Sequence, residues 1–381
     1  MTKVAVAMSG GVDSSVAAAL AVEKYGKQNV FGITMKLFGD ENEAASDAAF
    51  VCEQLGIYHH VVNFGKEFEK EIIGNFISEY EQGRTPNPCI RCNSVIKFGY
   101  LLKKAQELGA DILATGHYAR IVFHSVTLSG TKGPEPEILD SSVEPQNDGA
   151  FRLFRGLDVA KDQSYFLYNL NQDQLEHVWF PLGELTKPEV RKLAAKYNLK
   201  TAKKTESQDI CFVATTTQEF LKNRVGAKPG NMVKSDGQIV GKHLGLPFYT
   251  IGQRRGFGGG FAEPLYVIGL DRDKNEVVVG VEGELYHAEM TVGDISWVGK
   301  KPELPCELDV KIRYNSEASS ATLSSVILTA GRIQDLDSSV RPQNDVSVKF
   351  TSPQRAITPG QTAVFYDGDQ VVGGGIIQSV H

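Results

Sequence analysis

The sequence predicts a doubly wound α/β domain with a parallel sheet, followed by a small linking domain and a C-terminal antiparallel β-barrel. In the first half, apolar runs typical of buried strands alternate with helical patterns, and a turn rich in glycine and serine joins the first strand to the first helix. After Lys204 the pattern changes to short alternating strands separated by glycine and proline. A chain of 381 residues with 41% hydrophobic residues is long enough for two or three such domains.

The α/β half begins with the apolar run 4–8, which is typical of a strand covered on both faces. Further strands are expected at 30–35, 58–64 and 112–117, and helices at 16–22, 44–55, 66–80 and 101–108. In such a fold the ligand lies beyond the carboxyl ends of the strands. Met35 and Gly116 stand at two of these ends, so we expect them to line the adenine and ribose of a nucleotide.

The β half shows short strand patterns at 230–240, 265–270, 276–281, 290–297, 306–314, 347–350 and 361–366. We therefore expect an α/β domain at 1–208, a linking domain at 209–286 and a barrel at 287–381. Two nearly identical segments, LDSSVEPQND and LDSSVRPQND, interrupt the first and third of these domains. They predict insertions at about 124–149 and 325–346 that are tolerated because long surface loops cost little.

The turn after the first strand reads Ser-Gly-Gly-Val-Asp-Ser-Ser over residues 9–15. Its glycines allow the backbone to approach an anion closely, and the following helix directs its free N–H groups at the same point. The spacing differs from the Walker loop and from the dinucleotide fingerprint. An ordinary Gly-Gly turn would explain neither Asp13 nor the paired serines, so the turn predicts a phosphate-binding loop.

Composition narrows the class of protein. Five cysteines in a chain with a large core argue against a disulfide scaffold, and the longest apolar runs are too short for a membrane helix, so a cytoplasmic protein is expected. The net charge of -6 argues against a strongly basic nucleic-acid binder. Basic residues nevertheless cluster at 187–204, at 251–256 and at 311–313. A solvated helix face explains the first cluster alone, whereas the three together indicate a phosphate-contacting surface.

Two segments carry cysteines with polar neighbours. The first, 85–93, contains two prolines followed by Cys89 and Cys92, and we expect it to be a rigid loop. The second, 206–213, contains Cys211 just after the basic cluster. The basic neighbours Arg91, Lys97, Lys203 and Lys204 predict lowered thiol pKa values, as in reactive thiolates.

Together these segments make a resemblance specific. The chain carries, in one order, SGGVDS at 9–14, the TPNP and CN motifs within 85–93, ATGHYAR at 114–120, KDQSYFL at 161–167, ICF at 210–212, IGQRRG at 251–256 and GGGII at 373–377. In this set it resembles the tRNA-specific 2-thiouridylases, which are ATP pyrophosphatases with a PP-loop. The resemblance implies an adenine-nucleotide α-hydrolase fold and the thiolation of C2 of the uridine at tRNA wobble position 34.

The resemblance also implies roles for individual residues. Cys92 matches the nucleophile, Cys211 matches the persulfide carrier, and the two would form a transient disulfide. Asp13 is expected to act in catalysis at the ATP site, whose matching residues are Ala7, Met8, Ser9, Gly10, Gly11, Val12, Asp13, Ser14, Met35 and Gly116. Matching tRNA-contact residues are Asn87, Pro88, Cys89, His117, Lys161, Asp162, Gln163, Arg313, Tyr314 and Gln361, of which the first three match the segment that contacts the target base.

The implied chemistry uses ATP and Mg²⁺ to adenylate the C2 oxygen of uracil, so that oxygen leaves with AMP. Sulfur comes from the persulfide on Cys211, either by direct attack or as hydrosulfide released by Cys92, and a reductant then reopens the disulfide. The partners implied are tRNA and a sulfur donor such as a cysteine desulfurase or a sulfur-relay protein. We also expect the uridine to be turned out of its stack.

Two alternatives stay open at this stage. Members of the family commonly carry Asp where this chain has Cys89, so Cys89, Cys92 and Cys211 form a candidate ligand set for an iron–sulfur cluster that would carry the sulfur instead. The same phosphate loop also occurs in synthetases of the amidotransferase kind, which need an ammonia source. Cys52 and Cys306 lie in apolar contexts and are expected to be ordinary buried residues.

Overall fold

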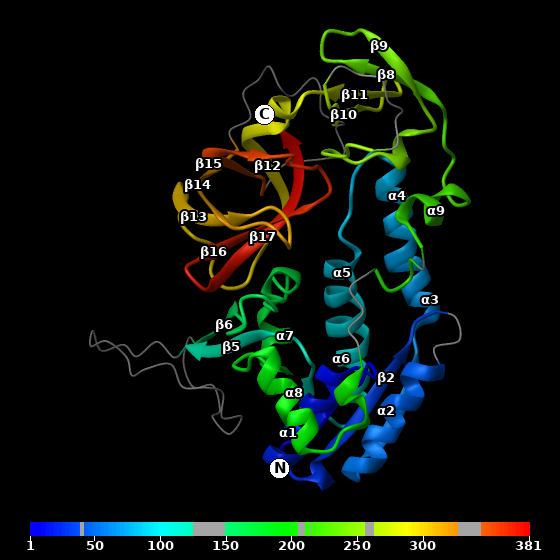
Figure 1. Ribbon diagram of the computed structural model, residues 1–381. Coiled ribbons are helices and arrows are strands. Elements are labelled where there is room, and N and C mark those ends of the chain that lie inside the picture. The colour runs from blue at the N-terminus through cyan, green and yellow to red at the C-terminus, as the bar shows by residue number, and fades with distance from the viewer. Residues whose placement is uncertain (39–41, 125–148, 205–209, 214, 256–262, 327–343) are drawn as a thin grey trace.

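The computed structural model describes residues 1–38, 42–124, 149–204, 210–213, 215–255, 263–326 and 344–381. Figure 1 shows the N-terminal sheet and its helices at one end of the molecule, with the barrel and the linking domain at the other. This arrangement confirms the predicted fold class. The predicted domain limits at 208 and 286 stay predictions.

The N-terminal sheet has five parallel strands in the order β3-β2-β1-β4-β7. Val4, Ala5 and Val6 have no exposed surface, because helices cover both faces of the central strand. The strands are β1 (Val4–Ala7), β2 (Val30–Lys36), β3 (Tyr58–Asn63), β4 (Ile112–Ala114) and β7 (Val178–Trp179). The sequence did not predict β7, because a strand of two residues has no readable periodicity.

Alternate residues of β1 enter two different cores, as the pleat of a strand requires. Ala5 packs in one core, whereas Val4 and Val6 pack in the other. The second core lies beneath α1 (Val12–Tyr25), α2 (Asn42–Leu55) and α8 (Lys187–Lys196). The first lies beneath α6 (Leu102–Glu107), the short helix η4 (Ser164–Phe166) and α7 (Gln172–Glu176).

Two long helical segments lead from the sheet toward the other domains (Figure 1). The first consists of α3 (Gly65–Phe68), the π-helical η2 (Glu69–Ile73) and α4 (Gly74–Glu81), and confirms the helix expected at 66–80. The second consists of α5 (Pro88–Arg91), the π-helical η3 (Cys92–Leu101) and α6. Among the described residues, no helix combines the length and the apolar character needed to span a bilayer.

The linking domain is a four-stranded sheet in the order β10-β11-β8-β9, preceded by the short helix α9 (Thr217–Lys222). Its strands are β8 (Gly230–Lys234), β9 (Ile239–His243), β10 (Tyr266–Asp271) and β11 (Glu276–Gly280). Met232, Val267 and Val277 form its core. The single strand expected at 230–240 is thus two strands, joined by a turn at Gly237.

The C-terminal domain is a closed antiparallel barrel of six strands, because the first strand pairs with the last. Its strands are β12 (Tyr286–Trp297), β13 (Cys306–Lys311), β14 (Ser319–Ser325), β15 (Val346–Arg355), β16 (Thr362–Asp367) and β17 (Gln370–Val380). The GGGII motif lies in β17. A Cβ atom on Gly373 would lie 2.5 Å from the carbonyl oxygen of Ser296, so glycine permits the closure.

A hairpin from the first half of the chain extends the sheet of the barrel. Strands β5 (Ala119–His124) and β6 (Ala150–Arg155) pair with each other, and β6 also pairs with β17. The repeated segments lie largely outside the described residues, but both are flanked by hairpins, β5–β6 and β14–β15. The strands that flank the first insertion therefore belong to the same sheet as those that flank the second, although the first pair comes from the first half of the chain.

Candidate active site

The loop between β1 and α1 lies at the carboxyl end of the parallel sheet. Gly10 has a φ of +71°, and a Cβ atom there would lie 2.6 Å from the carbonyl oxygen of Ala44, so only glycine fits. The Ser14 hydroxyl accepts a hydrogen bond from the backbone N–H of Ser9 at 3.2 Å. Gly11 stands at the N-cap of α1 and has no side chain to cover the first turn. The loop therefore directs helix N–H groups toward a space suited to an anion.

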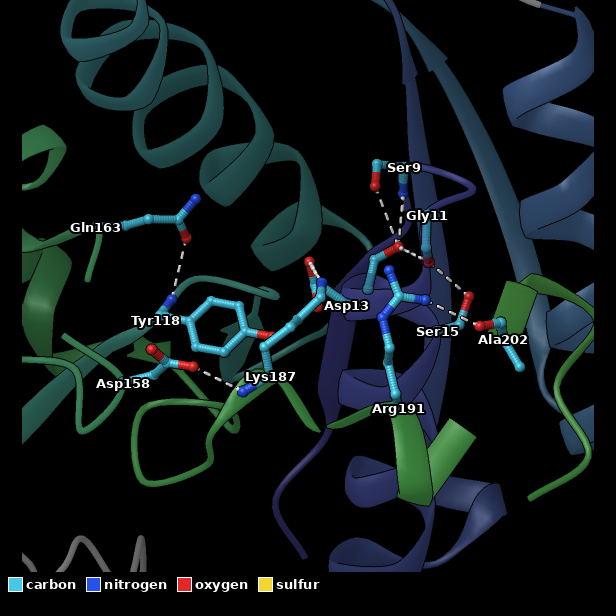
Figure 2. Close-up of polar contacts among 11 residues, drawn as sticks. Ser9, Gly11, Asp13, Ser15, Tyr118, Asp158, Gln163, Lys187, Arg191 and Ala202 are labelled. Atoms are coloured by element: carbon cyan, nitrogen blue, oxygen red, sulfur yellow. Dashed lines mark hydrogen bonds and ion pairs between the residues drawn. The ribbon is translucent and has the colours of Figure 1, made fainter. Parts of the chain in front are cut away.

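Asp13 in the first turn of α1 forms a partly buried ion pair. The Lys187 ammonium lies 2.7 Å from Oδ1 and 2.8 Å from Oδ2 of this carboxylate, and the Tyr118 hydroxyl donates to Oδ1 at 2.8 Å. Figure 2 shows these three side chains converging beside Ser9 and Gly11. The catalytic Asp13 predicted from the sequence is thus at the loop, with a cation and a hydroxyl that the prediction did not include.

The strand order reverses between β1 and β4, which is where an open α/β sheet binds its ligand. A Cβ atom on Gly116 would lie 2.9 Å from the backbone nitrogen of Ser14, so β4 approaches the loop closely only because this residue is glycine. Met35 stands near the end of β2 and is half-buried. Both predicted nucleotide-lining residues therefore lie at this edge of the sheet.

His117, a predicted tRNA contact, lies inside the same edge. Its Nδ1 shares a hydrogen bond of 2.7 Å with the Thr115 hydroxyl, and the rings of Phe98 and Phe180 pack against it. Burial, helped by the charge of Lys97, lowers the pKa of His117 well below its usual value. The imidazole is therefore neutral at pH 7, and any contact it makes with RNA is not an ion pair with phosphate.

The segment expected to be a rigid loop at 85–93 is instead the start of a helix. Asn87 caps α5 by accepting a hydrogen bond from the backbone N–H of Cys89 at 3.2 Å, and Pro88 occupies the first helical position. A proline there is preorganised for a helix and loses no hydrogen bond. Cys92 therefore lies in a helix, one turn after the exposed Cys89.

The prediction of a lowered thiol pKa is wrong for Cys92. Burial raises the pKa of this thiol above its ordinary value, and the Lys97 ammonium opposes only part of the rise. Arg91 does not face the thiol but bonds the Glu71 carboxylate at 2.8 Å. Cys92 is therefore a protonated thiol at pH 7 in this structure, and its activation requires a change in its surroundings.

The segment around Cys211 docks on the apolar cluster that contains Cys92. Phe212 and Val213 are buried in this cluster, whereas Cys211 itself is exposed. The Phe212 ring packs edge to face on Phe76, with ring centres 5.3 Å apart. The fold thus brings two cysteine segments, far apart in sequence, to one cluster, and neither Cys92 nor Cys211 is in a disulfide.

The candidate iron–sulfur ligands are not gathered in this structure. Cys89, Cys92 and Cys211 all lie within the described residues, and across those residues no three His, Cys, Asp or Glu side chains are grouped to hold a metal ion. Cys89 is exposed while Cys92 is buried among apolar side chains. The arrangement of these three cysteines therefore does not fit a cluster.

A cavity of about 400 Å³ separates the helix that carries Cys92 from the barrel. The barrel is held against this helix partly by Gln361, whose side chain donates to the carbonyl oxygen of Thr85 at 2.8 Å. The cavity is lined on the helix side by Asn87, Arg91 and Ser94 and on the barrel side by Ser296, Gly360 and Thr362. Its volume is in the range of small-ligand sites, and its lining combines these polar residues with apolar ones such as Ile90 and Ile376.

Comparison with known proteins matches the whole chain. The family model for the tRNA methyl transferase HUP domain matches residues 2–215, that for the tRNA methyl transferase PRC-barrel domain matches 218–281, and that for the aminomethyltransferase beta-barrel domain matches 287–377. The tRNA-specific 2-thiouridylase MnmA of Carboxydothermus hydrogenoformans is 43% identical over 394 residues, which covers 99% of this chain and 97% of that protein. The chain belongs to the tRNA-specific 2-thiouridylase family.

A second 2-thiouridylase, MnmA of Trichlorobacter lovleyi, is 44% identical over 386 residues and covers 100% of this chain and 98% of that protein. Among solved structures, the NH3-dependent NAD synthetase of Campylobacter jejuni aligns at 17% identity with a TM-score of 0.30, over 54% of this chain and 69% of that one. A TM-score this low supports no argument about the site.

Several residues predicted to contact tRNA have partners within the structure. The buried Asp162 carboxylate accepts hydrogen bonds from the N–H and the hydroxyl of Ser164, each at 3.0 Å. Gln163 accepts one from the N–H of Tyr118 at 3.0 Å, while Lys161 is half-buried. The hydrogen bonds of Asp162 and Gln163 fix the turn between β6 and η4, and the contact of these residues with tRNA stays a prediction.

On the barrel, Arg313 and Tyr314 lie beside the α/β domain. The Arg313 guanidinium donates to the Thr358 hydroxyl at 3.2 Å, and burial lowers the pKa of this group. The Tyr314 ring packs on Phe166, with ring centres 4.5 Å apart. Both predicted tRNA contacts therefore lie at the junction of two domains of this 2-thiouridylase, and their role in binding stays a prediction.

The basic cluster at 187–204 is only partly a free surface, and its contact with phosphate stays a prediction. Lys187 is paired with Asp13, and Lys200 and Lys204 lie 3.1 and 2.7 Å from the two oxygens of Asp47. These two lysines hold the pKa of Asp47 below its usual range. Sequence reasoning missed Lys187 because a lysine within a basic run looks the same whether it faces solvent or a buried carboxylate.

Proposed function

We propose that this chain is an ATP-dependent tRNA 2-thiouridylase that replaces the C2 oxygen of the uridine at wobble position 34 with sulfur. The observation that carries the proposal is 43% identity to a named 2-thiouridylase over 99% of the chain, a span that includes the phosphate loop and both cysteine segments. The α/β domain would activate the uridine, and Cys92 and Cys211 would deliver the sulfur. The protein's predicted cytoplasmic location is a further part of this proposal.

Activation must come first, because the C2 oxygen of uracil is a poor leaving group. Attack of this oxygen on the α-phosphorus of ATP forms an adenylate and releases pyrophosphate. The α1 N-terminus and the Ser9–Ser15 loop stabilise the departing negative charge. Asp13 is the carboxylate at this loop that fits a magnesium ion, which would neutralise the pyrophosphate when bound.

Sulfur transfer then uses both cysteines. The terminal sulfur of a Cys211 persulfide adds to C2 and AMP leaves, after which the Cys92 thiolate attacks the Cys211 sulfur. The C2–sulfur bond is kept, the sulfur–sulfur bond of the adduct breaks, and a Cys92–Cys211 disulfide forms. In the second route, Cys92 attacks the persulfide first and releases hydrosulfide, which adds to C2. In both routes a thiol reductant supplies two electrons to reopen the disulfide.

The positions of the two thiols support Cys211 as the persulfide carrier and Cys92 as the resolving thiol. Cys211 is exposed, so a protein donor of persulfide sulfur, such as a cysteine desulfurase or a sulfur-relay protein, has access to it. Cys92 is buried, which protects the resolving thiol from outside oxidants. The target uridine would leave its stack to reach them, at a cost of about a few kcal/mol. The cavity beside Asn87 supports entry of tRNA between the helix and the barrel.

The experiment is nucleoside analysis after incubation of the full chain with unmodified tRNA, ATP, Mg²⁺, a persulfide donor and a dithiol reductant. We expect thiouridine at position 34, and one AMP and one pyrophosphate for each sulfur transferred. Cys92→Ser and Cys211→Ser should each abolish the product. Cys306→Ser is the matched control, because this half-buried thiol lies on β13, away from both cysteine segments.

The same assay distinguishes the proposed thiolation from the alternative function. An amidotransferase-like synthetase would consume ATP with ammonia and leave the tRNA unchanged. A tRNA whose position 34 is cytidine should give no sulfur incorporation. Absence of thiouridine with the wild-type chain, under conditions in which ATP is bound and the donor is loaded, would refute the proposal.

A further inference from the structure

Lys187 is set apart by its burial. Among the described residues it is the one buried lysine, with 8% of its surface exposed. An ammonium removed from water is costly unless it is paired. Its partner is Asp13, the acidic residue of the phosphate loop, and the two belong to different helices, α8 and α1.

The backbone of Lys187 is fixed by the start of α8. Its N–H donates to the Asp158 carboxylate at 2.8 Å, and the N–H of Thr186 donates to the Glu189 carboxylate at 2.7 Å. Pro188 follows in the first turn. Figure 2 shows the Lys187 side chain reaching from this helix start to Asp13, alongside Tyr118. The ammonium lies 5.8 Å from the centre of the Tyr118 ring, which adds an attractive contact.

The pair is placed at the edge of the anion site rather than deep in the core. Asp13 keeps 29% of its side chain exposed, compared with 10% for Lys187. Asp13 lies two residues after Gly11, the residue at the N-cap of α1. A phosphate group bound at this helix start would therefore approach the Asp13 carboxylate and the ammonium together.

Stability alone gives a weak reason for this pair. Buried ion pairs often contribute little net stability, because the loss of hydration offsets their attraction. An uncompensated carboxylate beside a phosphate site would also repel ATP, whereas an ammonium held there attracts it. Lysine is suited to phosphate because its three donors rotate to follow the oxygens.

We propose that Lys187 binds the pyrophosphate portion of ATP, and that Asp13 and Tyr118 hold its ammonium at the loop before the nucleotide arrives. On binding, phosphate oxygens share the ammonium with the Asp13 carboxylate, because its three donors can serve more than one acceptor. The inference rests on the proposed splitting of ATP and assigns one residue of this chain to the leaving group.

The test is binding of inorganic pyrophosphate alone to the full chain, measured by calorimetry. Lys187→Met should weaken binding by about 10- to 100-fold, which corresponds to about 1.4 to 2.8 kcal/mol. Lys187→Arg should restore most of it. Asp13→Asn should tighten binding, because the ammonium is no longer shared with a carboxylate. Lys103→Met, at an exposed lysine of α6, should bind as the wild type does.

The double variant Asp13→Asn, Lys187→Met keeps the test decisive if Lys187→Met fails to fold, since it leaves no unpaired buried charge. It should lose the affinity that Asp13→Asn gains. Equal pyrophosphate affinity of Asp13→Asn and the double variant would overturn the inference, as would a wild type that does not bind pyrophosphate. If binding depends on Lys187 but no thiouridine forms, the proposed function fails and this inference stands.

Discussion

Phe212→Ala tests how the fold brings the two cysteines together. Phe212 follows Cys211 directly and is 8% exposed. Its ring packs against Phe68, Phe76 and Phe220, with centres 5.7, 5.3 and 5.3 Å away. These contacts anchor the Cys211 segment to the cluster that contains Cys92.

The cost of removing this ring follows from its burial. Phenylalanine to alanine changes in cores cost about 3 to 5 kcal/mol. The described segment 210–213 is four residues long, and Phe212 is one of its two buried residues. We therefore expect the lost free energy to weaken the docking of this segment on the cluster. At 1.4 kcal/mol for each tenfold change, 3 kcal/mol lowers the docked population about 100-fold relative to the undocked one. Formation of the Cys92–Cys211 disulfide should slow by at least about tenfold.

The assay is mild oxidation of the purified chain, followed by alkylation and peptide mass spectrometry at timed intervals. The matched control is Phe50→Ala, because the Phe50 side chain on α2 is 47% exposed. Thermal unfolding of both variants shows whether the α/β domain remains intact. A folded Phe212→Ala chain that forms the disulfide at the wild-type rate would refute the reasoning, because docking by this ring would then be irrelevant to the meeting of the thiols.

Two further predictions concern the phosphate loop and the buried thiol. Gly10→Ala places a methyl group 2.6 Å from the Ala44 carbonyl oxygen, which is a steric clash. The positive φ of this residue adds a further cost of about 1–2 kcal/mol for alanine. The KM for ATP should therefore rise at least about tenfold. Gly109→Ala, at a positive φ with no atom within 4 Å, should leave the KM unchanged. Alkylation of Cys92 by iodoacetamide should accelerate as pH rises and reach half its maximum above about pH 8.5, because burial raises the thiol pKa.

Contrary outcomes are readily recognised. A normal KM for ATP in Gly10→Ala would show that the loop tolerates a side chain at this point. Half-maximal alkylation of Cys92 below pH 8, in the folded chain without ATP or tRNA, would show that Lys97 outweighs burial and that the thiol is activated in advance.

Local patterns predicted much of the fold. The apolar run at 4–8 and the Gly10–Gly11 turn predicted the first strand, the phosphate loop and the helix after it. A buried strand requires apolar residues and a close backbone approach requires glycine, so both can be recognised from residue type. The segment at 85–93 was misjudged for a local reason. Asn87 followed by Pro88 is a helix start, and the prolines were interpreted only as restraints on a loop.

The sequence by itself determined that the chain has a nucleotide loop at the end of a buried strand and two separated cysteine segments. Both depend on residue type and short-range spacing. Only the tertiary structure decided which groups meet: Lys187 with Asp13, Phe212 with the cluster of Cys92, and β6 with the barrel. These contacts join residues far apart in sequence. The type of a basic or an apolar residue does not identify the residue that it contacts in the folded chain. The raised pKa of Cys92 has the same origin, since burial is a property of the assembled core and not of the neighbouring residues in the chain.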